Sequence, residues 1–162
     1  MQDKRNIRLG NIENASTDIH AYYDKSWAIV IGINDYGDRH PTLANAKNDA
    51  VGFAAVLEQK LGFENVFILL DGEATRDAIM DWLRDKLRTQ VGRNDRVIFF
   101  FAGHGTTWSS IQDSETIKYG YIIPHDAEAG KYSQYIDMDE LRRACGMIPA
   151  KHILMILDCC FS

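Results

Sequence analysis

The stretch "RVIFFFAGHG", residues 96–105, decides how this chain folds. Apolar side chains follow Arg96 without interruption as far as Ala102, and the run then ends at a histidine between two glycines. A short continuous apolar run of this kind is typical of a strand buried on both faces of a parallel sheet. Residues 96–101 are therefore predicted to form a central strand, with His104 just beyond its end.

Three further runs have the same character and are predicted to be strands of the same buried type. They are "WAIVIGI" at 27–33, "NVFILL" at 65–70 and "HILMILD" at 152–158. Strands of one sheet that recur along a chain with helices between them give a mostly parallel sheet, because right-handed crossovers allow little else. The sequence therefore predicts an α/β domain.

Helical patterns separate these strands. Apolar residues from Ala50 to Leu61 recur at helical spacing, and Gly62 is expected to end that helix. Thr75 is expected to cap a second helix and Asp137 a third, with Glu140 in the position of a capping box. Residues 105–134 are predicted to be irregular apart from a small strand or hairpin at "YGYIIP".

Length and composition set further limits. The chain has 162 residues, enough for one domain, and its net charge of −5 argues against nucleic acid as a partner. Its three cysteines, two of them adjacent, do not form a disulfide framework, which favours a reducing, cytoplasmic location. Residues 1–25 are polar and are expected to be a mobile lead-in without a signal peptide or membrane anchor, followed by one domain at 26–162.

Two reactive residue types follow two of the predicted strands. His104 follows residues 96–101, and Cys159 and Cys160 follow residues 152–158. If these strands are neighbours, the histidine and a thiol meet at the carboxyl edge of the sheet, where α/β domains place their sites. An imidazole that takes the thiol proton makes a nucleophile, and a nearby backbone amide can hold an oxyanion. The alternative is that the cysteines are small core residues and His104 belongs to a loop.

At this point the chain resembles a known family, the caspase-like cysteine peptidases, and in particular the metacaspases and their bacterial relatives. The resemblance rests on "FFFAGHG" followed by "DCCFS", with 56 positions from His104 to Cys160, and on "WAIVIGINDY", "LANAKNDA" and "YIIPHDA" in the same order. It covers residues 26–162 and implies the caspase-hemoglobinase fold, a three-layer α-β-α sandwich.

The resemblance also implies roles for particular residues. In the family's D-x-C-x-S-G motif the third residue is the nucleophile, which is Cys160 here, and His104 is its partner. Metacaspase-like members cut after Arg or Lys with the help of two acids, which correspond to Asp49 and Asp158. Two carboxylates suit a guanidinium because both can accept charge-assisted hydrogen bonds. The amide of Gly103 or of Cys160 is expected at the oxyanion site.

Three features depart from the family pattern. Ala102 stands where many metacaspases have a serine that lines the specificity pocket, so that contact is lost. Met138 stands at one expected acid of the calcium-binding segment, which leaves Asp139 and Asp113 and argues against calcium activation. No metal or other cofactor is therefore predicted.

The third departure is the end of the sequence at Ser162, where family members continue with a glycine and the small-subunit strands. The chain is therefore expected to be a large-subunit fragment whose partner is the missing portion, and whose last strand would have an exposed apolar edge. The predicted function is a cysteine endopeptidase that cleaves after Arg or Lys in peptides or proteins. The alternative is a catalytically silent or incomplete caspase-like domain that acts as a regulatory or interaction module.

Overall fold

The structure is a computed structural model that describes residues 22–112 and 115–160. Most of the predicted lead-in, residues 1–21, lies outside this range. The residues just before the first strand contact the domain: the Tyr23 hydroxyl lies 2.9 Å from Nδ1 of His152, and the Asp24 amide donates to the Asn94 carbonyl at 3.1 Å.

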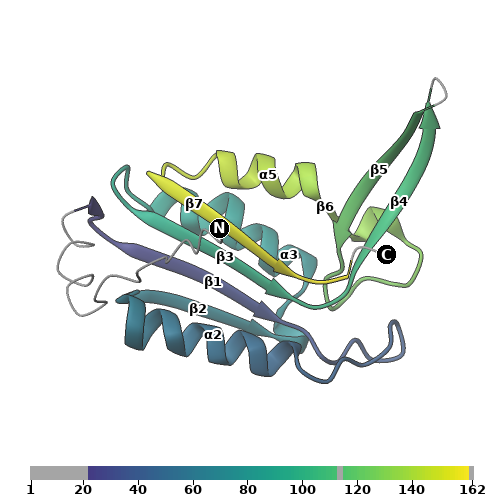
Figure 1. Ribbon diagram of the computed structural model, residues 1–162, viewed down its shortest axis with the longest axis horizontal. Coiled ribbons are helices and arrows are strands. Elements are labelled where there is room, and N and C mark those ends of the chain that lie inside the picture. Colours follow the sequence, from purple (N-terminus) through teal and green to yellow (C-terminus); the bar gives the residue numbers. More distant parts are fainter. Residues whose placement is uncertain (1–21, 113–114, 161–162) are drawn as a thin grey trace, which may run out of the picture.

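A four-stranded parallel sheet forms the centre of the domain (Figure 1). The strands lie in the order β2 (Asn65–Leu70), β1 (Ser26–Gly32), β3 (Arg96–Ala102) and β7 (His152–Asp158). All three neighbouring pairs are parallel, so every carboxyl end lies at one edge. The predicted α/β class is confirmed, and each predicted strand agrees with the observed one to within a residue.

Helices cover both faces of this sheet (Figure 1). On one face lies α2 (Ala46–Leu61), which ends at Gly62 with a φ of 65°. On the other face, α3 (Arg76–Asp81) continues through the π-helical segment η3 (Trp82–Lys86) into α4 (Leu87–Gln90), and α5 (Met138–Gly146) packs beside it. The expected caps are present, because Thr75 accepts from the Ala78 amide and Asp137 from the Glu140 amide.

The alternation of side chains along the central strands divides the core in two. Ile29 and Ile31 of β1 pack with α3, η3 and α4, whereas Ala28 and Val30 pack with α2. Each strand therefore contributes apolar side chains to both layers, which explains the uninterrupted apolar runs in the sequence.

The Glu140 side chain does not complete a capping box; it accepts from both Arg76 and Arg84.

The segment after β3 corrects one prediction. Residues expected to be irregular form a long antiparallel hairpin of β4 (Gly105–Gln112) and β5 (Glu115–Ile122), to which the short β6 (Ile136–Asp137) adds. The hairpin projects from the body of the domain (Figure 1). The Thr, Ser and Gly residues of these strands interrupt the apolar pattern by which a strand is predicted. Cross-strand pairs such as Trp108 and Tyr119, with ring centres 5.5 Å apart, stabilise the hairpin.

Strand β7 also differs from the prediction of a buried strand. Within the described part of the chain only β3 pairs with it, and Leu154 is 54% exposed. Its exposed side chains agree with the expectation of an apolar edge. Two short 3₁₀ turns, η2 (Asp71–Glu73) and η4 (Tyr132–Gln134), complete the secondary structure of the described residues.

Strand β1 and helix α2 approach each other closely at Gly32. A Cβ atom at Gly32 would lie 2.6 Å from Cβ of Ala50 and 2.7 Å from the Ala46 carbonyl oxygen. We expect Gly32→Ala to lower the free energy of unfolding by about 1–3 kcal/mol, because the helix must move away from the strand. Urea denaturation measures this effect.

The matched control is Gly52→Ala within α2, where no other atom lies within 4 Å of the added Cβ atom. Since alanine favours helix more than glycine does, this variant should gain about 0.5–1 kcal/mol. Equal effects of the two substitutions would contradict the tight packing of α2 on β1.

Candidate active site

The register of the parallel sheet brings the candidate residues together. Gly32, Ala102 and Asp158 lie opposite one another at the carboxyl ends of β1, β3 and β7. His104 lies two residues beyond Ala102, and Cys160 lies two residues beyond Asp158. The predicted pairing of the two strand ends is thus observed, and it places the imidazole and the thiol on one edge.

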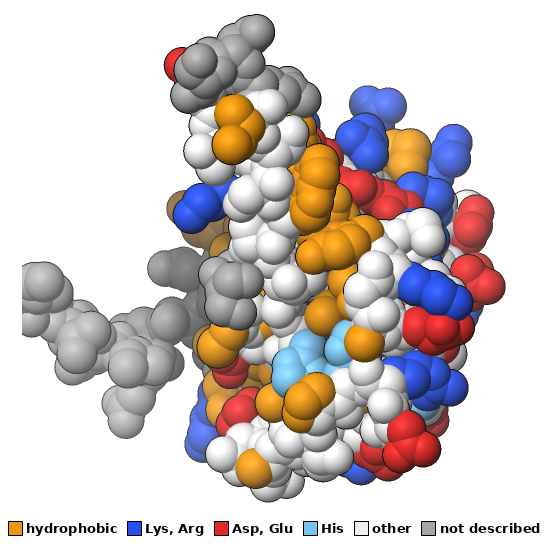
Figure 2. Space-filling model, turned by 90° about the vertical axis from the view of Figure 1, so that its right-hand side faces the viewer, with side chains coloured by type: hydrophobic (Ala, Val, Ile, Leu, Met, Phe, Trp, Pro, Cys, Tyr) orange, Lys and Arg blue, Asp and Glu red, His pale blue; other side chains and the backbone are white. Residues whose placement is uncertain are grey.

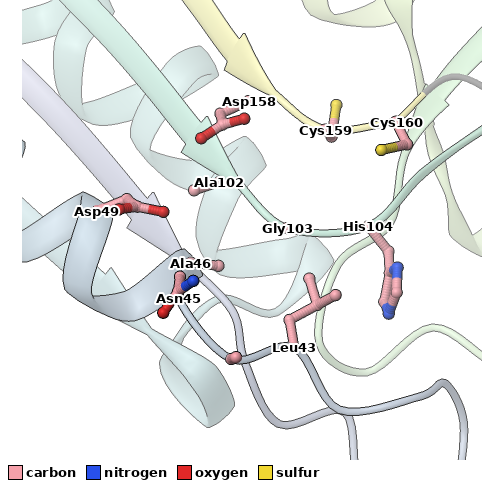
Figure 3. Close-up of a pocket in the computed structure, with 11 residues that line it drawn as sticks. Leu43, Asn45, Ala46, Asp49, Ala102, Gly103, His104, Asp158, Cys159 and Cys160 are labelled. Atoms are coloured by element: carbon pink, nitrogen blue, oxygen red, sulfur yellow. The ribbon is translucent and has the colours of Figure 1, made fainter.

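A pocket of about 270 Å³ opens at this edge (Figure 3). All six residues expected from the sequence line it, namely Asp49, Ala102, Gly103, His104, Asp158 and Cys160. The remaining lining comes from Cys159 and from the segment that enters α2, residues 43–46. Three separate elements therefore build one site.

Two carboxylates border one end of this pocket. Asp49 belongs to the first turn of α2, and Asp158 ends β7; their side chains lie on either side of Ala102 (Figure 3). Ala102 and Ala46 are buried and offer only methyl groups there. The result is a small apolar floor beneath two solvent-facing carboxylates, an arrangement that suits a cationic group on an aliphatic stem.

His104 is held by the loop between β1 and α2. Its Nε2 lies 2.7 Å from the Pro41 carbonyl oxygen, and its backbone amide donates to the Tyr36 hydroxyl at 2.9 Å. Because a carbonyl only accepts, Nε2 carries a proton, and Nδ1 is the unprotonated nitrogen of the neutral ring.

In Figure 3 the ring of His104 points away from both cysteines, toward the loop that carries Leu43. No hydrogen bond joins His104 to Cys160 among the residues that the structure describes. Nucleophile and base are commonly looser without substrate than in the reacting complex.

The two adjacent thiols face different surroundings. Cys160 is exposed, whereas Cys159 is half-buried and packs against the core. Burial, with the charge of Asp158 and the neighbouring Cys160, raises the pKa of Cys159 to about 12. Cys145 in α5 is buried, which raises its pKa to about 11. Of the three, only Cys160 is freely accessible to a substrate.

The small size of Gly103 is required by its close neighbours. Its N–H donates to the Asp158 carbonyl at 3.3 Å and so extends the sheet, and its expected role as an oxyanion donor stays a prediction. A Cβ atom there would lie 2.7 Å from the Tyr36 hydroxyl and 2.9 Å from the Phe101 ring. The amide of Cys160 stays a predicted oxyanion donor as well.

Sequence reasoning missed the contribution of the loop at residues 33–45, above all Tyr36 and Pro41. The loop is tied to its surroundings by Asn34, whose side chain donates to the Ala44 carbonyl at 3.2 Å and accepts from the Lys47 amide at 3.0 Å. Asp71 accepts from the amides of Asn34 and Asp35, at 2.8 and 3.0 Å. Pro41 acts through a backbone carbonyl, so no side-chain pattern could identify it. Tyr36 belongs to the motif "INDY", which was the only signal for this loop in the sequence.

Two further predictions concern metal binding and membrane spans. Within residues 22–112 and 115–160 no three His, Cys, Asp or Glu side chains group as a metal site. Asp139 lies 3.3 Å from Arg142, and Asp113 lies outside the described residues. None of the described helices has the length and apolarity required to cross a bilayer.

The fold and this pocket define a class of protein, an α/β domain with a cysteine and a histidine at neighbouring strand ends. Residues 25–162 match the family described as "Caspase domain". The chain therefore belongs to the caspase-domain family, a family of cysteine peptidases.

Among solved structures, the chain is similar to protein GSU0716 from Geobacter sulfurreducens. The two share 24% sequence identity with a TM-score of 0.66, over 84% of this chain and 50% of that one. This likeness supports the fold, and the chain spans half the length of that relative. No curated protein matches the sequence.

The different surroundings of the cysteines predict selective labelling. At pH 8, iodoacetamide should modify Cys160 well before Cys159 and Cys145, because burial keeps the latter two protonated and covered. Peptide mass spectrometry after a time course measures each site. As a control, Cys159→Ser should leave the rate at Cys160 unchanged. Faster labelling of Cys159 than of Cys160 would contradict this assignment.

Proposed function

We propose that this domain is a cysteine endopeptidase of the metacaspase type that cleaves after Arg or Lys, with Cys160 as nucleophile and His104 as its acid–base partner. One observation carries the proposal: a single pocket is lined by an exposed thiol, an imidazole and two carboxylates that come from distant parts of the chain. Parallel strand ends explain why residues so far apart in sequence share one site.

The proposed reaction begins with proton transfer from Cys160 Sγ to His104 Nδ1. The thiolate then attacks the carbonyl carbon of the scissile bond, and the negative oxygen of the intermediate accepts from the Cys160 amide. Collapse breaks the C–N bond as the imidazolium gives its proton to the leaving amine. Water, deprotonated by His104, hydrolyses the thioester and restores the thiol.

Pro41 supports this assignment of roles. Its carbonyl accepts from Nε2–H at 2.7 Å and would continue to do so when the ring is protonated. The hydrogen bond therefore reserves Nδ1 for the exchange of protons with the thiol. The Pro41 carbonyl would thus have the role that a carboxylate has in other catalytic triads.

Specificity is proposed to come from Asp49 and Asp158. A guanidinium presents several donors in one plane and can bridge two carboxylates, whereas an ammonium acts as a point charge. With Ala102 in place of a serine, both carboxylates carry the recognition without a hydroxyl beside them. Peptides and proteins with a basic residue before the cleaved bond are thus the proposed substrates, and the cytoplasmic location stays a prediction.

The second candidate is a caspase-like domain without activity of its own, acting as a regulatory or interaction module. The orientation of the His104 ring away from Cys160 favours it (Figure 3). In that case the sheet and pocket would be retained, while Cys160 would react like an ordinary exposed thiol. Binding of the small-subunit portion, the expected partner, would then decide whether activity appears.

The two candidates are separated with peptidyl acyloxymethyl ketones that end in Arg or in Asp. We expect the Arg reagent to label Cys160, and His104→Ala to abolish this labelling. Asp49→Asn or Asp158→Asn should each slow it about tenfold or more, because a charge-assisted hydrogen bond is lost. Intact-mass and peptide mass spectrometry follow the adduct.

The matched control is Asp139→Asn, which removes an exposed acid from α5, outside the pocket. It should label at the unaltered rate. Labelling that is indifferent to the peptide, or unaffected by His104→Ala, would favour the inactive module.

A further inference from the structure

Tyr36 is a buried phenol that touches the candidate histidine at two places. Its side chain is fully buried in the loop between β1 and α2. The hydroxyl accepts from the His104 amide at 2.9 Å and donates to the Ile123 carbonyl at 3.2 Å. It thereby links the corner after β3 to the segment that leaves the hairpin at the end of β5.

The aromatic ring of Tyr36 also packs against imidazoles. Its centre lies 5.0 Å from that of His104, 5.4 Å from that of His40 and 6.4 Å from that of His125. Figure 2, which looks onto the carboxyl ends of the strands, shows histidine side chains gathered on this face beside hydrophobic ones. His40 and His125 are held in turn by the carbonyls of Ala127 and Asp35, at 3.1 and 2.7 Å.

One loop therefore holds His104 at both ends. Tyr36 binds its backbone amide, and Pro41, five residues later in the same loop, binds the tip of its ring. Gly103 lets the chain approach so closely that an added Cβ atom would lie 2.7 Å from the hydroxyl. His104 is thus anchored by hydrogen bonds at its backbone and at its far ring nitrogen.

We propose that Tyr36 is a positioning residue for His104: its hydroxyl fixes the backbone about which the imidazole would turn to meet Cys160. The inference rests on the proposed function, because it concerns the same histidine and thiol. Burial raises the pKa of the Tyr36 hydroxyl well above its usual value. The hydroxyl therefore stays protonated and donates to Ile123 over the whole range in which a His–Cys pair works.

The test measures how fast iodoacetamide alkylates Cys160 between pH 5 and 9 in four forms of the full chain: the parent protein, His104→Ala, Tyr36→Phe and Tyr135→Phe. In the parent protein, His104 should speed the reaction near neutral pH by favouring the thiolate. Tyr36→Phe keeps the ring but loses both hydrogen bonds. We expect its rate near pH 7 to fall about tenfold or more, toward that of His104→Ala, with a matching shift in the pH profile.

Tyr135→Phe is the matched control, because Tyr135 is also buried and its hydroxyl accepts from the Gly130 amide at 2.8 Å, away from His104. Both tyrosine variants should melt at a lower temperature, but only Tyr36→Phe should change the pH profile of Cys160. A merely structural role for Tyr36 predicts parent-like profiles in both and would overturn the inference. A parent protein that reacts at the rate of His104→Ala would overturn the proposed function as well.

A second variant applies if Tyr36→Phe does not fold. Gly103→Ala leaves the hydroxyl in the chain but forces a methyl group against it. We expect the same loss of His104-dependent alkylation. A folded Gly103→Ala protein with the pH profile of the parent would contradict the positioning role.

Discussion

The parallel register of β1, β3 and β7 is the constraint on which the site depends. It sets Gly32, Ala102 and Asp158 in one row across the sheet. The residues of the pocket belong to this row, follow a strand beyond it, or lie in α2 and the segment that enters that helix. A shift of one residue in any of these strands would turn each side chain to the opposite face.

Gly32 shows how this constraint extends to α2. The helix approaches the end of β1 so closely that no side chain fits between them, and its first turn therefore lies directly over the row. Asp49 lines the pocket because it belongs to this first turn. The core supports the arrangement from both sides, since alternate residues of β1 and β3 fill the two layers.

The sequence predicted the sheet and the pocket lining well, because long apolar runs and the residues just beyond them are local features. Strands β2 and β7 agree with the predicted bounds, and six residues chosen from motifs line one pocket. The hairpin of β4 and β5 was predicted only in part, as a small strand or hairpin at "YGYIIP", since its pairing depends on contacts between strands of low apolar content. Pro41 was missed because a carbonyl group is common to every residue, and only the folded loop directs this one toward His104.

The adjacent cysteines illustrate a conflict within the site. Neighbouring residues beyond a strand end face opposite sides, so Cys159 packs inward while Cys160 is exposed. The charge of Asp158 opposes a thiolate at Cys159. In the proposed function, an arginine or lysine side chain bound at Asp49 and Asp158 would offset their charge beside the thiol of Cys160. In a pocket that works in this way, selection of a cation and activation of the thiol would be linked by the same two charges.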